Sequence, residues 1–183
     1  MKKRKFIFFL IFLIFLCFFF FFYLKDKEIR ELNKNLPQGV YFEKRGKDLF
    51  LVNKLDGYEL KIPKSWEGVR EVRYVDNGVH LEGKNYQLLS IFSYSLKDKN
   101  ISVEKWVSKE VIPTGKFVEP KIIEKTKISF YEVIGIKDFG GMMGELFFFY
   151  LKRPQGSRIY EFLSDSKEVV KEAIVNFILK NEK

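Results

Sequence analysis

Few side chains of this sequence could carry out acid–base or nucleophilic chemistry. His80 is the only histidine of the 183 residues, and the only cysteine, Cys17, lies inside a long apolar run. A Ser-His-Asp or Cys-His mechanism would have to use His80, and no Gly-x-Ser-x-Gly sequence is present to hold a serine nucleophile. A Cys2His2-type zinc site is excluded by the same count. We predict no catalytic residue, no metal site and no cofactor, and interpret His80 as a structural or solvated residue of a strand.

Two short segments imitate nucleotide-binding motifs. Residues 78–85 (Gly-Val-His-Leu-Glu-Gly-Lys-Asn) have the glycine spacing of a phosphate-binding loop. Asn85 replaces the Ser/Thr that would hold Mg²⁺, and residues 79–81 have the pattern of a strand, where the motif requires a loop that leads into a helix. Residues 138–140 (Asp-Phe-Gly) match the metal-binding triplet of kinases, but so short a chain contains no other kinase element. Neither segment predicts a nucleotide site.

Seven residues are candidates for contact with a ligand or a partner without any chemical step. Two tryptophans and a tyrosine could provide stacking surfaces in a cleft between sheet and helix, and a loop rich in glycine and methionine could form a mobile contact surface. These candidates are Trp66, Tyr86, Trp106, Gly140, Gly141, Met142 and Met143. Core packing is the alternative interpretation of Trp66, because an indole ring can bury a large apolar area while its N–H binds a polar partner.

Charge and cysteine content exclude further classes of protein. The formal net charge is +9, but outside residues 2–5 the lysines and acids are interspersed and form no basic tract. Nucleic-acid binding therefore has no electrostatic footprint in this sequence, and mild attraction to anionic lipid headgroups is the most that the charge supports. Because Cys17 is the only cysteine, the domain can form no internal disulfide and must be held together by packing.

The N-terminus has the pattern of a membrane anchor. Residues 6–24 contain no charge, no glycine and no proline, and as a helix they would span about 28 Å, close to the thickness of the hydrocarbon core. The run is longer than the apolar core of a cleaved signal peptide, and no Ala-x-Ala-like site follows it. Cys17 lacks the small preceding residue of a lipoprotein leader. We expect an uncleaved signal-anchor.

The flanking charges predict the orientation of this anchor. Four Lys/Arg residues precede the apolar run and belong on the cytoplasmic side. The expected organisation is a cytoplasmic stub (1–5), a transmembrane signal-anchor (6–24), a stalk or linker (25–46) and an extracytoplasmic domain (47–183). The protein is thus expected at the cell membrane, with a single pass.

The sequence of the domain predicts a β-sheet. Residues 71–75 and 79–81 flank Asp-Asn-Gly, a type I′ hairpin signal, because asparagine and glycine tolerate positive φ angles. Residues 145–152 are expected to form a strand, and within it 146–151 are apolar without alternation, which predicts a strand that is covered on both faces. The other expected strands are 48–53, 58–62, 86–96, 121–125, 127–136 and 158–163.

Two helices complete the expected elements. Ser102 has the position of an N-cap for a helix over 103–110, and Ile101 and Trp106 are spaced to pack against each other across the cap. A second helix is expected over 165–179, where apolar residues recur at helical spacing.

Three segments carry a resemblance to a known family. They are 57–66 (Gly-Tyr-Glu-Leu-Lys-Ile-Pro-Lys-Ser-Trp), 101–107 (Ile-Ser-Val-Glu-Lys-Trp-Val) and 158–162 (Arg-Ile-Tyr-Glu-Phe) ahead of Val-Asn-Phe at 175–177. The chain resembles the PsbP-like proteins over about 47–179. This superfamily includes the photosystem II oxygen-evolving extrinsic protein, the DcrB-type lipoproteins and the Mog nuclear-transport factor. The resemblance implies an α+β fold in which helices sandwich an antiparallel β-sheet (α/β/α), tethered here by one N-terminal transmembrane helix, and it implies no shared catalytic residues.

Two functions follow as hypotheses. The leading one is a membrane-anchored, extracytoplasmic, non-enzymatic module that docks on an envelope or membrane complex, with an envelope protein as a possible partner and no nucleic acid. The alternative is an envelope protein that binds a small ligand with Trp66, Trp106 or Tyr86 as the stacking surface. A hydrolase that uses His80 is the least favoured, because the sequence offers it no companion residues.

Overall fold

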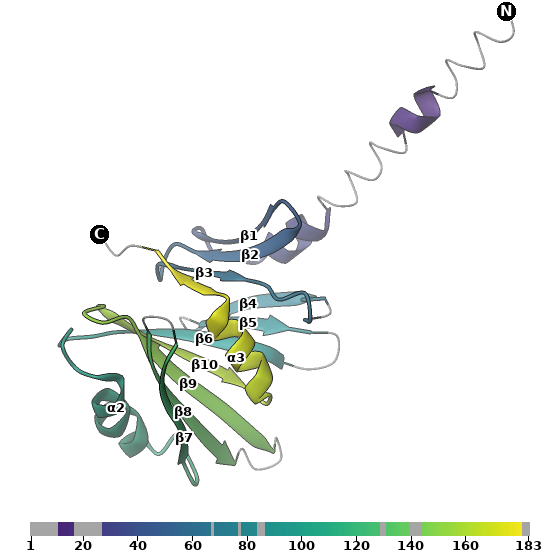
Figure 1. The fold of residues 1–183 in the computed structure, drawn as a ribbon. Helices are drawn as coiled ribbons and strands as arrows, with labels where there is room; N and C mark the ends of the chain where they lie inside the picture. Colours follow the sequence, from purple (N-terminus) through teal and green to yellow (C-terminus); the bar gives the residue numbers. More distant parts are fainter. Residues whose placement is uncertain are drawn as a thin grey trace, which may run out of the picture.

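Two antiparallel β-sheets make up most of the computed structural model, which describes residues 11–16, 27–66, 68–76, 78–83, 87–128, 131–139 and 144–180 (Figure 1). One sheet has four strands in the order β1-β2-β3-β11, and the other has seven in the order β4-β5-β6-β10-β9-β8-β7. Adjacent strands of the larger sheet are consecutive in the sequence except at its centre, where β10 pairs with β6.

The strands of the four-stranded sheet are β1 (Val40–Arg45), β2 (Asp48–Asn53), β3 (Tyr58–Lys61) and β11 (Phe177–Leu179). Those of the seven-stranded sheet are β4 (Glu71–Val75), β5 (Gly78–Glu82), β6 (Gln87–Ser95), β7 (Lys121–Ile128), β8 (Tyr131–Phe139), β9 (Glu145–Lys152) and β10 (Arg158–Ser164). The labelled helices are α2 (Val103–Trp106), which continues as a π-helical turn (Val107–Val111) and a 3-10 turn (Ile112–Thr114), and α3 (Lys167–Val175). Residues 27–33 are also helical.

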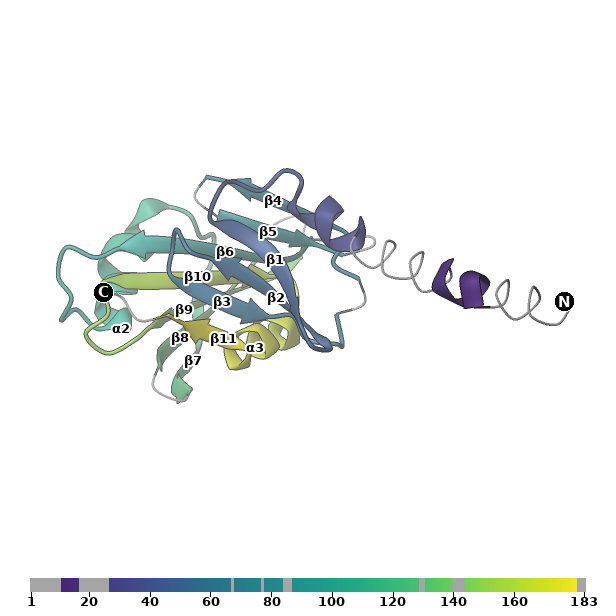
Figure 2. The same ribbon diagram turned by 90° about the horizontal axis from the view of Figure 1, so that it is seen from above.

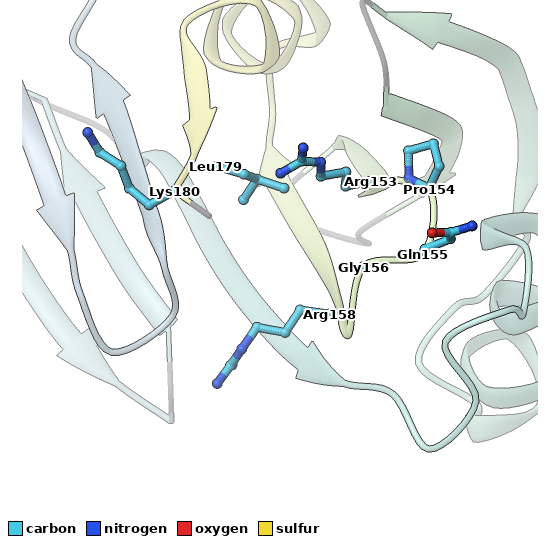
Figure 3. A pocket seen from close by; sticks show the side chains of 7 residues that line it. All are labelled: Arg153, Pro154, Gln155, Gly156, Arg158, Leu179 and Lys180. Carbon is cyan, nitrogen blue, oxygen red and sulfur yellow. The ribbon is translucent and has the colours of Figure 1, made fainter. Parts of the chain in front are cut away.

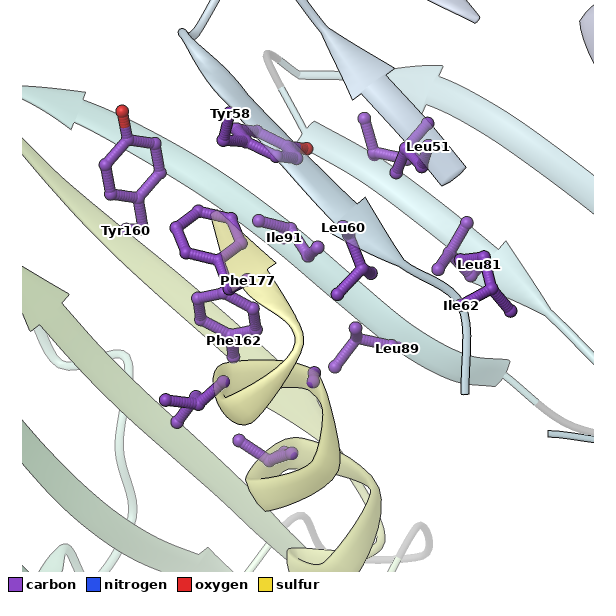
Figure 4. Close-up of a cluster of buried hydrophobic side chains, with 14 of the residues drawn as sticks. Leu51, Tyr58, Leu60, Ile62, Leu81, Leu89, Ile91, Tyr160, Phe162 and Phe177 are labelled. Atoms are coloured by element: carbon purple, nitrogen blue, oxygen red, sulfur yellow. The ribbon is translucent and has the colours of Figure 1, made fainter. Parts of the chain in front are cut away.

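The main core lies between the two sheets (Figures 2 and 4). Phe42, Leu51, Leu60 and Phe177 are successive cross-strand neighbours and form one buried row on the inner face of the four-stranded sheet. The ring of Phe177 meets the ring of Phe162 of β10 edge to face, with 5.0 Å between centroids. Because side chains alternate between the faces of a strand, the neighbours of this row point to the outer face.

Helices extend the cover on both faces of the seven-stranded sheet. On the side of the main core, α3 buries Val170, Ala173 and Ile174. On the opposite face, α2 and its π-helical continuation form a second, smaller core with β8, β9 and β10. The fully or nearly buried members of this second core include Val103, Val107, Ile136, Phe148, Tyr150 and Ile159.

The predicted fold class, one antiparallel sheet sandwiched by helices, is wrong. The structure is mostly β, and one of its layers is formed largely by the four-stranded sheet rather than by helices. Residues 177–179, which the helical pattern assigned to the last helix, form β11 instead. Asn176 ends α3, and Phe177 then pairs with Leu60 of β3. Burial of the Phe177 ring between the sheets outweighs local helical preference, as tertiary packing often does.

The predicted transmembrane helix is also corrected. Within the described residues, no helix is both long and apolar enough to cross a membrane. Of the range 6–24 the structure describes only the helical residues 11–16, which as a helix span about 9 Å; the rest of that range lies outside the described residues. The single-pass membrane localisation with a cytoplasmic N-terminus, the extracytoplasmic placement of the domain and the membrane as a partner are therefore not supported.

A cluster of hydrogen bonds around Asp56 joins the two sheets. Asp56 lies in the turn between β2 and β3, and its Oδ1 accepts hydrogen bonds from Arg158 Nη1 (2.9 Å) and Ser93 Oγ (2.5 Å) of the other sheet. Its backbone carbonyl accepts a further bond from the hydroxyl of Tyr160 (2.6 Å), and its Oδ2 accepts one from Asn53 Nδ2 (2.9 Å). We call these five residues the Asp56 clamp. The clamp fixes one end of the four-stranded sheet on β6 and β10.

A buried carboxylate occupies the other face of the seven-stranded sheet. The Glu161 side chain is 1 % exposed and accepts hydrogen bonds from the Tyr94 hydroxyl (2.8 Å) and from Lys116 Nζ (2.5 Å). Lys116 follows the 3-10 turn, and its ammonium group also lies over the rings of Phe92 and Phe148, at 5.9 and 5.1 Å from their centroids. The ion pair therefore ties the segment after α2 to the centre of the sheet.

Lys116→Met should destabilise the fold, because it leaves the carboxylate of Glu161 buried without a countercharge. We expect a loss of about 3 kcal/mol in the free energy of unfolding, measured by urea denaturation. The double variant Lys116→Met/Glu161→Gln removes the charge as well and should recover most of the loss. A single variant as stable as the wild type, or a double variant no better than the single one, would contradict this role of Lys116.

Candidate functional site

The structure describes two of the predicted contact residues, Trp66 and Trp106, and places them in different parts of the fold. Trp66 follows β3 and is 6 % exposed; its Nε1 donates a hydrogen bond to Glu172 Oε2 of α3 (2.9 Å). Ser65 Oγ donates to the same oxygen (2.9 Å), so this part of the chain is fastened to α3. Trp66 thus lies in the core, as in the alternative interpretation. Tyr86, Gly140, Gly141, Met142 and Met143 lie outside the described residues.

Trp106, in contrast, lines a groove between the end of β6 and the helical segment. The cavity has a volume of about 300 Å³ and is lined by apolar and charged side chains. One side of the indole packs on two tyrosines of the seven-stranded sheet, with ring centroids 5.3 Å away for Tyr94 and 6.0 Å for Tyr150. Trp106 is only half-buried, and its N–H has no hydrogen-bond acceptor among the described residues. We call this depression the Trp106 groove.

Local sequence places Trp106 at the groove. Ser102 is extended and its hydroxyl accepts a hydrogen bond from Lys105 N (3.2 Å), which confirms the predicted N-cap. Val103 and Val107, four residues apart, share one buried side of the helical segment and anchor it on the second core. Trp106 and Lys105 are thereby directed to the side that lines the groove.

The groove carries more positive than negative charge. Lys97, Lys105 and Lys109 line it together with two acids, Asp98 and Glu110. Asp98 Oδ1 accepts a hydrogen bond from Asn100 N (2.8 Å), and Glu110 lies 3.6 Å from its neighbour Lys109 at the exposed surface. Among the described residues, Lys97 and Lys105 have no ion-pair partner. Two ammonium groups are thus available to an anionic group that enters the groove.

The described lining of the groove offers contacts that suit binding. It contains an aromatic face, apolar contacts from Leu96 and Ile101, and lysines. Within the part of the chain that the structure describes, no group of three or more His, Cys, Asp or Glu could hold a metal ion.

His80 lies on β5, in contact with a serine that substrate could not reach. Its Nδ1 is 2.8 Å from Ser90 Oγ, and Ser90 is fully buried. The imidazole meets the Phe92 ring edge to face, with 5.3 Å between centroids. This pair therefore belongs to the packing of the sheet.

The two segments that imitate nucleotide-binding motifs are parts of β5 and β8. Residues 78–82 form β5, so the glycine-spaced segment begins as a strand and not as a phosphate-binding loop. Asp138 lies at the end of β8, and its two carboxylate oxygens accept hydrogen bonds from Val118 N (3.1 Å) and Glu119 N (2.7 Å). Its role in the structure is to hold the segment ahead of β7.

The lysines that line the Trp106 groove were not predicted as site residues from the sequence. Charged helix faces were interpreted as solvated surface, which is the usual situation for such residues. The available signal was spacing: Lys105 and Lys109 are four residues apart on the segment that carries Trp106, so they lie on one side of it. Lys97 comes from the end of β6 and could be placed beside them only by tertiary structure.

No family model matches the chain, and no curated protein matches it either. The resemblance to PsbP-like proteins therefore stays a prediction from the motifs that carry it.

Stability should fall at alkaline pH because of the tyrosines behind Trp106. Burial, with a contribution from the charge of Glu161, raises the pKa of the Tyr94 and Tyr150 hydroxyls above the ordinary value of about 10. Burial is also the main cause that raises the pKa of the Tyr58 hydroxyl. Above pH 10 the unfolded chain loses these protons while the folded chain keeps them, so unfolding becomes more favourable as pH rises.

Urea denaturation between pH 8 and 11, followed with phenolate absorbance, measures this effect. We expect constant stability to about pH 9.5 and a decline above it, with part of the phenolate signal appearing only on unfolding. Tyr94→Phe/Tyr150→Phe should reduce the decline. Ionisation of every tyrosine in the folded protein would contradict the burial of these hydroxyls.

Proposed function

We propose that this chain is a non-enzymatic binding domain whose Trp106 groove takes a small planar molecule with a negatively charged group. The observation that carries the proposal is the half-buried indole of Trp106, which lines a cavity of about 300 Å³ together with three lysines. The helical segment with α2 lies beside β8 and β9, at the lower left in the view of Figure 1.

The size and lining of the groove fit such a ligand. A volume of about 300 Å³ lies at the small end of ligand pockets and suits a molecule of one or two rings. Stacking on an aromatic side chain contributes about 0.5–1.5 kcal/mol beyond the area it buries. Tyr94 and Tyr150 support the indole from behind, so Trp106 needs little rearrangement to receive a ring. Lys97, Lys105 and Lys109 then supply the charge that selects an anion over a neutral analogue.

The docking or accessory role remains the second hypothesis. It rests on the resemblance to PsbP-like proteins, and no described surface indicates the chemistry of a partner. The two roles differ in a simple respect: a small ligand raises the melting temperature of the isolated chain by mass action, whereas a docking module requires its protein partner.

Calorimetric titration with 2-naphthoate and its neutral analogue 2-naphthamide tests the proposed groove. We expect 2-naphthoate to bind at least fivefold more tightly than the amide, because only the acid interacts with the lysines. Trp106→Ala should weaken binding at least tenfold, and Lys105→Gln/Lys109→Gln should remove most of the preference for the acid.

The matched control is Lys64→Gln/Lys127→Gln, which removes two exposed lysines elsewhere and should leave both affinities unchanged. The melting temperature of each variant shows whether it is folded. Equal affinity in the wild type and in a folded Trp106→Ala variant would refute the proposal.

A further inference from the structure

A second depression lies at the open end between the two sheets, far along the chain from Trp106. The turn between β9 and β10 meets the residues that follow β11 there, and the cavity between them has a volume of about 330 Å³ (Figure 3). Arg153 extends from the turn toward Leu179, while Arg158 extends from the start of β10 away from the turn (Figure 3). Lys180 comes from the end of β11. We call this depression the inter-sheet pocket.

The described lining of the inter-sheet pocket has three cationic side chains, Arg153, Arg158 and Lys180, and no carboxylate. Two buried acids pair with two of these cations. Asp56 accepts a hydrogen bond from Arg158, and Glu59 Oε1 lies 3.0 Å from Lys180 Nζ. The described lining of the pocket is therefore cationic, while the acids that pair with it are buried.

The acids do not neutralise this charge fully. Glu59 already accepts two hydrogen bonds from Arg45, at 2.7 and 2.8 Å, so one carboxylate is shared between Arg45 and Lys180. Arg158 uses only Nη1 for its bonds to Asp56 and Ser93. Among the described residues, the Nε and Nη2 donors of its guanidinium have no partner. A guanidinium that is held on one side and open on the other suits an oxyanion.

The turn that carries Arg153 is tight. Gly156 N donates a hydrogen bond to Arg153 O (2.9 Å), and Gln155 adopts a positive φ of 60°. A Cβ on Gly156 would lie 3.0 Å from that same carbonyl oxygen, so a larger residue would require the turn to shift by a few tenths of an ångström. The backbone of the turn thus packs closely at the rim of the pocket.

We propose that the inter-sheet pocket binds a small molecule with two or more oxyanion groups, phosphate or carboxylate, through Arg153, Arg158 and Lys180. Such a ligand would bridge the β9–β10 turn of the seven-stranded sheet and the last strand of the four-stranded sheet. It binds the folded state alone, since these three residues come together only in the assembled fold, and it therefore stabilises that state. The proposal is independent of the Trp106 groove.

Thermal unfolding of the full chain with inorganic pyrophosphate or citrate, at constant ionic strength set by sodium chloride, tests this site. We expect a saturable rise in melting temperature of about 3–6 °C at ten times the Kd. The two probes distinguish phosphate from carboxylate as the preferred group. Arg153→Gln/Lys180→Gln should abolish the rise, since both residues are at or near the surface and their exchange leaves Arg158 and the Asp56 clamp in place.

Arg70→Gln/Lys64→Gln is the matched control, because it removes the same charge from exposed positions elsewhere and should keep the rise. Trp106→Ala should keep it as well, which separates this site from the groove. The proposal is overturned if neither probe raises the melting temperature beyond sodium chloride, or if the Arg153→Gln/Lys180→Gln variant responds as the wild type does.

Discussion

The arrangement of this molecule depends on the Asp56 clamp. Apolar packing brings the two sheets together, but burial of apolar surface is nearly non-directional and does not by itself select one relative position. Asp56 adds direction, because its carboxylate meets Arg158 and Ser93 while its carbonyl meets Tyr160. The residue is 9 % exposed, so a misplaced sheet would leave a largely desolvated carboxylate without its partners Arg158 and Ser93. The clamp thus favours one position of the four-stranded sheet on the seven-stranded sheet over shifted positions in which these hydrogen bonds could not form.

Both candidate sites lie where a well-packed layer ends. The inter-sheet pocket lies beside the clamp, and Arg158 belongs to both: its Nη1 donates to Asp56 and Ser93, and its side chain is part of the pocket lining. The Trp106 groove lies where the helical segment leaves the second core, with Glu161 and Lys116 holding the sheet and the following segment together beneath it. In each case an ion pair with a buried carboxylate supports aromatic or cationic groups that remain accessible at the surface.

Local features of the sequence predicted local structure well. The Asp-Asn-Gly signal marked the β4–β5 hairpin, Ser102 caps α2, and the apolar run within β9 is buried on both faces. The start of the last helix was placed to within two residues, although its cap is Ser166 and not Asp165, but its end was wrong, because α3 ends at Val175 and not at Leu179. These features depend on contacts between residues that are close in the chain, which a sequence pattern can report.

The division into two sheets and the two sites could not be predicted in this way. β11 pairs with β3 across more than a hundred residues, and the helical pattern of 165–179 gave no sign of it. The Trp106 groove was anticipated only through its aromatic residue, since Lys97 joins it from another element. Arg153, Arg158 and Lys180 have no motif in common, and only the pairing of distant strands brings them together.

A double-mutant cycle between Asp56→Ala and Arg158→Ala tests the central claim most directly. Urea denaturation of the wild type, both single variants and the double variant gives the coupling free energy of the two side chains. If the clamp holds the sheets together, the coupling should be about 1.5 kcal/mol or more, with the double variant less destabilised than the sum of the single ones. Coupling within about 0.3 kcal/mol of zero would show that Asp56 and Arg158 act independently and would contradict the account.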